Sequence, residues 1–186
     1  MIGIPKITGL ELKPNWITAA DAEQLVSFID NQIWNTTLKR RVQQYGYRYD
    51  YGKRSIGRAL LNSMSSEFSA LCVRLGQELG EGRTFDQIIV NEYFPGQGIS
   101  AHVDSAIDFG PTIVSLSLLS AVCMKFQSVE TKQVEELYLE PLSLLVLQQE
   151  ARYRWAHAIP SRKSDKIGDQ RVWRQRRISL TFRTLA

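Results

Sequence analysis

The sequence predicts a mainly β protein of the α+β class, in which helices near the N-terminus pack outside a β sandwich or barrel. Helical periodicity is confined to the first half of the chain, and short strand-like runs follow from Gln87 onward. The composition, with 44% hydrophobic and 23% charged residues over 186 positions, is ordinary for a soluble globular protein. We therefore expect residues 1–186 to form a single domain.

Two helices are predicted in the first half. Thr18 followed by Asp21 has a capping-box pattern, and the apolar residues that follow share one helical face: Leu25, Phe28 and Ile29. A second amphipathic stretch ends near Gly80 and Gly82 and carries Phe68, Leu71, Cys72, Leu75 and Leu79.

The second half is predicted to form strands. Runs rich in Val, Ile, Leu and Phe are separated by Gly, Pro and Ser, and they cover residues 87–94, 112–119, 121–127, 142–149, 153–159 and 176–185. Many short strands with intervening turns are typical of a sandwich or barrel. The polar stretch 161–176 is predicted as a long loop between the last two strands.

The last strand has two different faces. Alternation places Ile178, Leu180 and Phe182 on one face, and it places a polar set on the other: Arg177, Ser179, Thr181 and Arg183. In an ordinary sandwich the polar face would contact water. If it turns into a barrel mouth instead, both arginines become ligands for an anion. The first strand of this half offers Asn91 and Tyr93 on one face in the same way.

Charge, cysteines and hydropathy set broad limits. The net charge of +4 is a modest surplus that favours polyanions without identifying a partner. Cys72 and Cys123 lie in apolar surroundings, which predicts free buried thiols of an intracellular protein. No stretch has the length and hydropathy of a signal peptide or a membrane span, so we expect a cytoplasmic protein with no membrane partner, monomeric by default.

The pair His102 and Asp104 predicts a metal site. Residues i and i+2 of a strand point the same way, and Gly96 and Gly98 allow a tight turn before them. The only other histidine, His157, lies in a later strand, which antiparallel pairing can bring alongside. Two histidines and one carboxylate leave open metal positions, as in non-haem Fe(II) oxygenases. A buried histidine of the core is the alternative interpretation of His157.

The sequence resembles the AlkB family of Fe(II) and 2-oxoglutarate-dependent dioxygenases. The resemblance rests on "NEYFPGQGISAHVDS" (91–105), which matches the family's N-x-Y-x-P-G segment and its H-x-D, and on "RRISLTFR" (176–183), which matches its closing R-x-N-x-T-F-R. It runs from about residue 45 to the C-terminus. Through "YGYRYDY", "PTIVSLSL", "SLLVL" and "ARYRWAHAI", the chain is most similar to the oxygenase domain of members that hydroxylate a modified wobble uridine in tRNA.

The resemblance implies a fold and a set of ligands. The fold would be a double-stranded β-helix, or jelly-roll, with the N-terminal helices outside. The cofactors would be Fe(II), 2-oxoglutarate as co-substrate and O2, with iron held by His102, Asp104 and His157. The co-substrate would contact Asn91, Tyr93, Arg177, Ser179 and Arg183, with Arg177 at its distal carboxylate.

Two positions depart from the family pattern. Ser179 stands where the family often has asparagine, which replaces an amide donor with a hydroxyl. Ala106 stands where the DNA-repair members carry a second acid that meets the damaged base, and Asp108 is the candidate to replace it.

Nucleic acid, as a single strand or a flipped base, is the predicted partner. Residues 45–58 interleave tyrosines with arginines, which suits stacking on a base, and Tyr47, Arg48 and Tyr49 are the predicted contacts. A tyrosine-rich hairpin over the core is the alternative. The other candidate is the loop 161–176 with its basic residues Arg162, Lys163, Lys166, Arg171, Arg174 and Arg176, unless this is simply a solvated charged loop. Trp155 and Trp173 are predicted to be packing residues.

The predicted function is oxidative demethylation of N-alkylated bases in DNA or RNA. Hydroxylation of a modified wobble uridine in tRNA is the first alternative, and oxidation of a protein or small molecule is the second. A binding module that has lost its chemistry is the third, although such a module would need neither the metal ligands nor the arginines.

Overall fold

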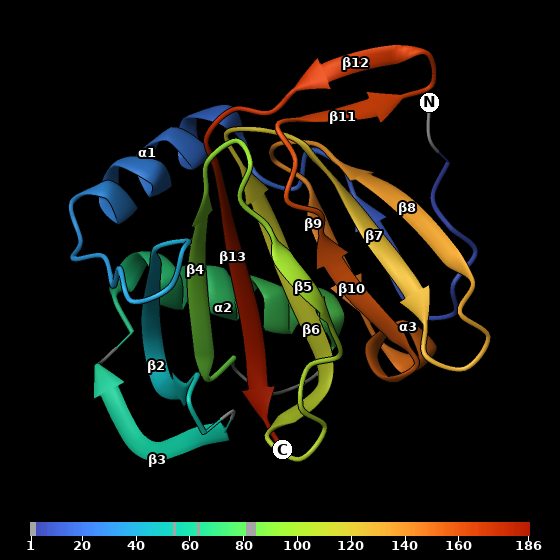
Figure 1. Cartoon of the computed structure of the whole chain (residues 1–186). Helices are drawn as coiled ribbons and strands as arrows, with labels where there is room; N and C mark the ends of the chain where they lie inside the picture. The colour runs from blue at the N-terminus through green and yellow to red at the C-terminus, as the bar shows by residue number, and fades with distance from the viewer. Residues whose placement is uncertain (1–2, 54, 63, 81–84) are drawn as a thin grey trace.

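The computed structural model describes residues 3–53, 55–62, 64–80 and 85–186, and its main body is two antiparallel sheets that face each other (Figure 1). The large sheet contains, in spatial order, β1 (Leu10–Lys13), β9 (Leu144–Leu147), β6 (Phe109–Leu118), β13 (Arg177–Leu185), β4 (Gln87–Tyr93), β2 (Val42–Asp50) and β3 (Ser55–Asn62). The small sheet contains β5 (Ile99–His102), β10 (Trp155–Ile159), β7 (Val122–Ser128) and β8 (Val134–Leu139). The predicted mainly β jelly-roll is confirmed.

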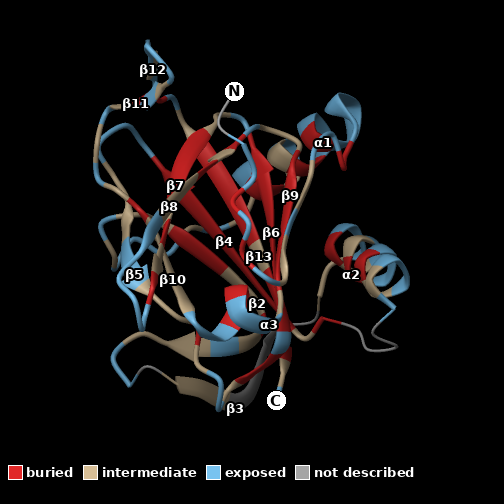
Figure 2. Cartoon of the chain, turned by 90° about the vertical axis from the view of Figure 1, so that its right-hand side faces the viewer, coloured by how far each residue is buried: buried red, intermediate tan, exposed pale blue. Residues whose placement is uncertain are grey.

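Both predicted helices are present. Helix α1 (Ala19–Asp30) begins after Thr18, whose hydroxyl accepts a hydrogen bond from the Asp21 N–H at 3.1 Å. Helix α2 (Ser66–Leu79) begins after Ser65 and ends at Gly80 in the left-handed region with φ 66°. Gly82, the other predicted helix end, lies outside the described residues. Figure 2 shows both helices on one side of the large sheet and the small sheet on the other.

The two faces of β13 have different neighbours, although both are buried. Ile178, Leu180 and Phe182 belong to the apolar core that the large sheet shares with α1 and α2. On the other face Arg177 is 2% exposed and Arg183 is 8% exposed. The interpretation in which this face contacts water is therefore wrong, because the second sheet covers it.

Several elements differ from the sequence prediction. The stretch 161–176 contains a hairpin made of β11 (Ser164–Ile167) and β12 (Gln170–Trp173), where a long loop was expected. Trp173 is 60% exposed on that hairpin, so the expectation that it packs in the core is wrong, whereas Trp155 packs against the core on the small-sheet side. The short helix α3 (Gln149–Tyr153) was not predicted.

Other sequence expectations agree with the structure. Cys72 and Cys123 are free and buried, and burial raises the pKa of Cys72 to about 12 and of Cys123 to about 11. In the described part of the chain, every helix is too short or too polar to cross a bilayer.

Candidate metal centre

Strand pairing brings the two histidines together. His102 is the last residue of β5, and in the antiparallel pairing of β5 with β10 it stands opposite His157. This close pairing requires a glycine near its start, because a Cβ on Gly98 would lie 2.1 Å from the Ile159 carbonyl oxygen. The preceding turn uses Gly96 with φ 92°, a conformation that other residues rarely adopt. The predicted antiparallel contact is confirmed.

His102, Asp104 and His157 form a compact set of ligand atoms. One nitrogen or oxygen from each lies within 4.8 Å of the others, and the Nε2 atom of His157 is 3.8 Å from Oδ2 of Asp104. This Oδ2 atom is buried and has no hydrogen-bond partner among the described residues. A buried carboxylate oxygen without a partner is costly unless a cation occupies the space beside it. The residues therefore fit a metal ion with two imidazole ligands and one carboxylate ligand.

The protonation states suit metal binding. The Nδ1 atom of His102 lies 2.8 Å from the Ser100 carbonyl oxygen, which can only accept, so Nδ1 donates to it and Nε2 is the nitrogen left to face a metal. Burial lowers the pKa of His157 to about 4, which keeps this ring neutral at physiological pH.

Asp104 is held as a carboxylate by an arginine. Arg183 donates from Nε at 3.1 Å and from Nη2 at 2.7 Å to Oδ1 of Asp104, which leaves Oδ2 for the metal. Burial alone would raise the pKa of Asp104, but the charge of Arg183, with smaller contributions from His157, His102 and Arg152, lowers it to about 2. Arg183 thus fixes both the charge and the orientation of the carboxylate.

A second buried arginine shapes the segment that carries Asp104. Arg152 of α3 is 2% exposed, and its guanidinium donates to backbone carbonyl oxygens of the segment after β5 and of the start of β6: Asp104 at 2.7 Å, Ser105 at 3.0 Å, Gly110 at 3.2 Å and Phe109 at 3.3 Å. Since one rigid fork satisfies all these carbonyls, the segment has little freedom to move.

The triad opens into a cavity of about 920 Å³ between the two sheets. The large sheet contributes most of the predicted co-substrate residues to its wall: Asn91, Tyr93, Ser179 and Arg183. The hydroxyl of Ser179, the residue that replaces asparagine, lies 2.9 Å from that of Ser115. Tyr49 and Tyr51 of β2 and the following turn complete the wall on another side. A cavity of this size accommodates a small co-substrate together with part of a larger substrate.

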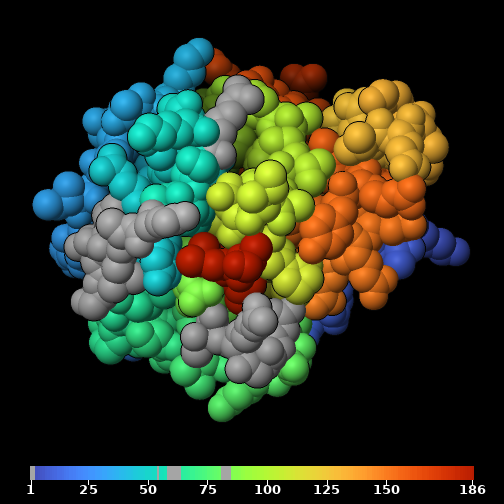
Figure 3. Space-filling view, turned by 90° about the horizontal axis from the view of Figure 1, so that it is seen from below, coloured from blue at the N-terminus to red at the C-terminus, as the bar shows by residue number. Residues whose placement is uncertain are grey.

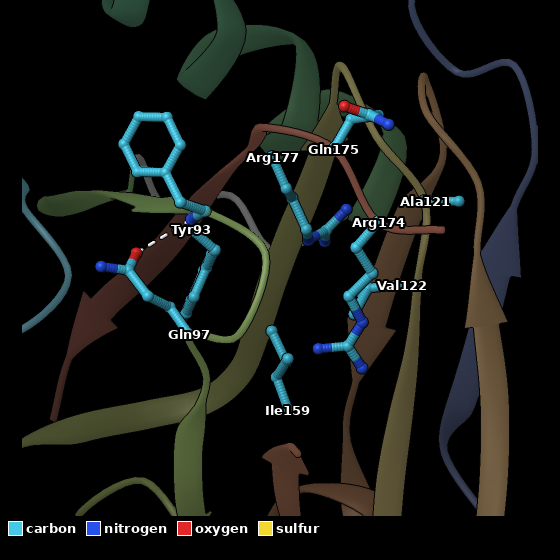
Figure 4. A pocket seen from close by; sticks show the side chains of 9 residues that line it. Tyr93, Gln97, Ala121, Val122, Ile159, Arg174, Gln175 and Arg177 are labelled. Carbon is cyan, nitrogen blue, oxygen red and sulfur yellow. Dashed lines mark hydrogen bonds between the residues drawn. The ribbon is translucent and has the colours of Figure 1, made fainter. Parts of the chain in front are cut away.

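Arg177 lies in a small adjoining cavity of about 10 Å³ whose wall it shares with Tyr93 (Figure 4). Its guanidinium donates to the Ser117 hydroxyl at 2.8 Å and to the Ser120 carbonyl at 3.1 Å, while its Nε has no partner among the described residues. Burial lowers the pKa of Arg177 to about 10, and no carboxylate of the described residues pairs with it. An arginine that is buried without a counterion is prepared for an anionic ligand.

The structure brings only one of the four predicted substrate residues to the cavity. Tyr49 lines it, whereas Tyr47 and the exposed Arg48 do not, because the β2–β3 pairing shifts register between residues 46 and 49. Arg54 and the side chain of Arg58, within the same predicted segment, lie outside the described residues.

Asp108 is also absent from the cavity wall. Its carboxylate accepts a hydrogen bond from the Ile56 N–H at 3.4 Å, and its carbonyl accepts from the Ala186 N–H at 3.1 Å. The Asp108 backbone therefore contacts the C-terminal residue, and Figure 3, which views the molecule from below, shows the red C-terminal residues beside a yellow-green segment.

Half of the basic residues of the stretch 161–176 have carboxylate partners. Asp165 is buried and pairs with Arg174 at 2.6 Å and with Arg162 at 2.7 Å. Arg176 pairs with Glu92 at 2.7 Å and also with Asp30. Lys163, Lys166 and Arg171 are exposed and have no carboxylate partner among the described residues. The stretch is therefore not a continuous basic loop, because three of its arginines are neutralised by carboxylates.

Arg40, Tyr51 and Arg152 contribute to the site without having been predicted from the sequence. Arg40 and Tyr51 lie on the wall of the cavity. Arg152 stands five residues before His157, and this spacing matches no sequence motif. Arg152 donates to the backbone beside Asp104, whereas His157 belongs to the triad itself.

Comparisons with known proteins agree with this geometry. Residues 9–183 match the model of the 2OG-Fe(II) oxygenase superfamily. A protein of Arabidopsis thaliana described as "Alkylated DNA repair protein ALKBH8 homolog" is 37% identical over 201 residues, which cover 95% of this chain and 58% of that protein. The mouse protein "tRNA (carboxymethyluridine(34)-5-O)-methyltransferase ALKBH8" is 36% identical over 140 residues, which cover 74% of this chain and 21% of that protein.

Among solved structures, that of OsALKBH1 has a TM-score of 0.74 at 18% identity and covers 95% of this chain and 96% of that one, which is a likeness of fold. The chain spans little more than half of the Arabidopsis relative and about a fifth of the mouse relative.

Proposed function

The chain belongs to the 2OG-Fe(II) oxygenase superfamily, and we propose that it is an AlkB-type dioxygenase that oxidises bases in nucleic acid, removing alkyl groups from base nitrogens in DNA or RNA. The observation that carries the proposal is the triad of His102, Asp104 and His157 on the wall of a cavity of about 920 Å³. Family membership implies Fe(II), 2-oxoglutarate and O2 as its cofactors.

We assign the metal ligands to Nε2 of His102, Oδ2 of Asp104 and Nε2 of His157. When bound, iron supplies the oxidising chemistry, in which decarboxylation of 2-oxoglutarate to succinate accompanies hydroxylation of a C–H bond. The protein's contribution is to hold Asp104 ionised through Arg183 and to keep the imidazole of His157 neutral.

We assign the co-substrate to the wall formed by β4 and β13. Arg177, which has no carboxylate partner among the described residues, would bind the distal carboxylate with the help of the Tyr93 hydroxyl, because a guanidinium fork matches a carboxylate in two hydrogen bonds. Asn91 and Ser179, paired across the two strands, would contact the middle of the molecule. Arg183 is engaged with Asp104 and would stand beside the carboxylate near the metal.

The substrate assignment rests on the opposite wall and on the relatives. Tyr49 and Tyr51 present aromatic surface to the cavity, and such surface stacks on a base that has left its helix. The name of the Arabidopsis relative refers to repair of alkylated DNA, and the name of the mouse relative refers to a uridine in tRNA. A hydroxylated N-methyl group decomposes with loss of formaldehyde, so repair would appear as demethylation.

Hydroxylation of a modified wobble uridine is the second candidate, and one observation favours it. The position of the second acid of DNA-repair members is Ala106, and the candidate replacement Asp108 is engaged with the Ile56 N–H outside the cavity. In the described structure the cavity therefore lacks the acid with which repair members meet a damaged base.

The test combines co-substrate turnover with a product screen. Purified protein with Fe(II) and 2-oxoglutarate is expected to release succinate, and His102→Ala is expected to abolish this release. Incubation with methylated single-stranded DNA, methylated RNA and bulk tRNA, followed by nucleoside mass spectrometry, then identifies the product. Loss of a methyl group supports repair, and gain of one oxygen on a uridine supports the second candidate.

Two results would contradict the proposal. Undiminished succinate release by His102→Ala would remove the triad from the chemistry. Turnover of 2-oxoglutarate without change in any nucleoside would favour a protein or small-molecule substrate, which the same iron site serves in other oxygenases.

A further inference from the structure

We propose that Arg40 and Tyr51 form a subsite for an oxyanion of the substrate, either a carboxylate on the base or a phosphate of the strand. The inference rests on the proposed function, because it places the substrate in the cavity beside the metal centre. It deepens that function by predicting that the group bound there carries a negative charge.

Arg40 places a cation in the cavity wall that has no counterion within the described part of the chain. It lies just before β2, it is half-buried, and its Nε donates to Oδ1 of Asn91 at 3.0 Å. Among the described residues no carboxylate lies within ion-pair distance of it, whereas the next residue, Arg41, pairs with the buried Glu92. A charge held away from full hydration without a partner favours binding of an anion.

Tyr51 supplies a second donor at the same place. The Arg40 guanidinium carbon is 6.0 Å from the centre of the Tyr51 ring, and the Tyr51 hydroxyl is buried without a hydrogen-bond partner among the described residues. Burial raises the pKa of this phenol, against the charges of Arg40 and Arg183, so the hydroxyl keeps its proton at neutral pH. A cation and an unused O–H group side by side are the groups that an oxyanion needs.

The co-substrate does not account for Arg40. In the pairing of β13 with β4, Arg177 stands opposite Tyr93, Ser179 opposite Asn91, and Arg183 opposite Gln87. A 2-oxoglutarate that extends from the Arg183 end to the Arg177 end has its carboxylates at its ends and methylene groups between them. Arg40 contacts Asn91, which is level with the middle of that row, so its charge is available to another molecule.

The test measures binding of anionic probes and of their neutral counterparts. Protein is loaded with Mn(II) and saturating 2-oxoglutarate under argon, so that the co-substrate is in place without turnover. Isothermal titration then compares 5-carboxymethyluridine with 5-carbamoylmethyluridine, and uridine 5′-monophosphate with uridine. The variants are Arg40→Gln, which removes the charge but still offers N–H donors from its amide, and Tyr51→Phe, which removes only the hydroxyl. Arg171→Ala, an exposed arginine on β12 outside the cavity wall, is the control for general charge.

In the wild-type protein at least one acid is expected to bind about tenfold tighter or more than its neutral counterpart, as for a charge-assisted hydrogen bond. Arg40→Gln should abolish this preference and Tyr51→Phe should reduce it, while Arg171→Ala keeps it. Preference for the carboxymethyl compound identifies a carboxylate on the base, and preference for the monophosphate identifies the strand.

The inference is overturned if neither acid is preferred, or bound at all, up to about 10 mM, or if the preference persists in Arg40→Gln. It is also overturned if Arg40→Gln weakens 2-oxoglutarate itself, because Arg40 then belongs to the co-substrate. In all of these cases wild-type protein that binds and turns over 2-oxoglutarate leaves the proposed function intact. Failure of the wild-type protein to bind 2-oxoglutarate overturns both.

Discussion

Replacing Arg177 with methionine is expected to stabilise the unliganded protein. The guanidinium is buried, and burial lowers its pKa from 12.5 to about 10. Since the group is charged in both the folded and the unfolded chain below about pH 10, its burial costs roughly 3 kcal/mol at neutral pH. Replacing the guanidinium with an apolar side chain removes this cost, but loss of the hydrogen bonds to Ser117 and Ser120 offsets about 2 kcal/mol of the stabilisation. Arg177→Met should therefore unfold about 2–4 °C higher than the wild-type protein.

The same change is expected to abolish tight binding of the co-substrate. Truncating one partner of a charged pair that excludes water costs about 2–5 kcal/mol, so the Kd for 2-oxoglutarate should rise at least about 30-fold. Isothermal titration with Mn(II) in place of iron measures this, and thermal unfolding with and without 2-oxoglutarate provides a second readout. Ligand should raise the unfolding temperature of the wild-type protein and leave that of the variant unchanged.

The neighbouring Arg176 is the matched control. It immediately precedes β13 and pairs with Glu92 and Asp30, so Arg176→Met leaves the buried Glu92 with fewer partners. This variant should lose about 3 kcal/mol of stability yet keep the wild-type Kd for 2-oxoglutarate. An unchanged Kd in Arg177→Met would refute the assignment, and a large loss of stability in that variant would refute the account of its burial.

Three further outcomes are expected. Asp104→Ala should lose Mn(II) binding and about 3 kcal/mol of stability, measured by urea unfolding, because it leaves Arg183 buried without its carboxylate; retention of Mn(II) would contradict the metal assignment. Arg152→Lys should weaken Mn(II) binding about tenfold in titration calorimetry, since one ammonium cannot satisfy the carbonyls that the guanidinium bridges, whereas an unchanged affinity would make Arg152 purely structural. Asp165→Asn tests pH dependence. Burial raises the pKa of Asp165, but Arg174 and its other partners lower it overall, so its stabilising contribution is present above about pH 4 and is lost as the pH falls through the folded-state pKa. The stability difference between wild-type protein and Asp165→Asn should shrink between pH 7 and pH 3, and a constant difference would show that the ion pairs do not contribute.

The three residues of the candidate metal site could be predicted to lie together because their signals are local. His102 and Asp104 are two residues apart, and the chain contains a single other histidine, so few arrangements were open. The start of the first helix could likewise be predicted, because Thr18 caps it with its own side chain. Alternation along β13 separated the apolar residues from the polar ones correctly, since a strand has a period of two whatever lies beside it.

The substrate side could not be predicted in the same way. The tyrosines of residues 45–51 alternate regularly in the sequence, yet a register shift in the β2–β3 pairing brings Tyr49 and Tyr51 to the cavity and leaves Tyr47 out. Arg40 belongs to no motif. Its position depends on contact with Asn91, which lies 51 residues away in the chain.

By itself the sequence determined the two long helices, several strands of both sheets, the candidate metal-binding residues and the presence of arginines on one face of the last strand. Only the tertiary structure decided that this face is covered by a second sheet, and therefore that Arg177 and Arg183 are buried and not solvated. The physical reason is that periodicity and capping act over a few residues, whereas burial depends on which distant strands pack together. Those neighbours decide whether a buried arginine pairs with a carboxylate of the protein, as Arg183 does with Asp104, or has only neutral partners, as Arg177 does.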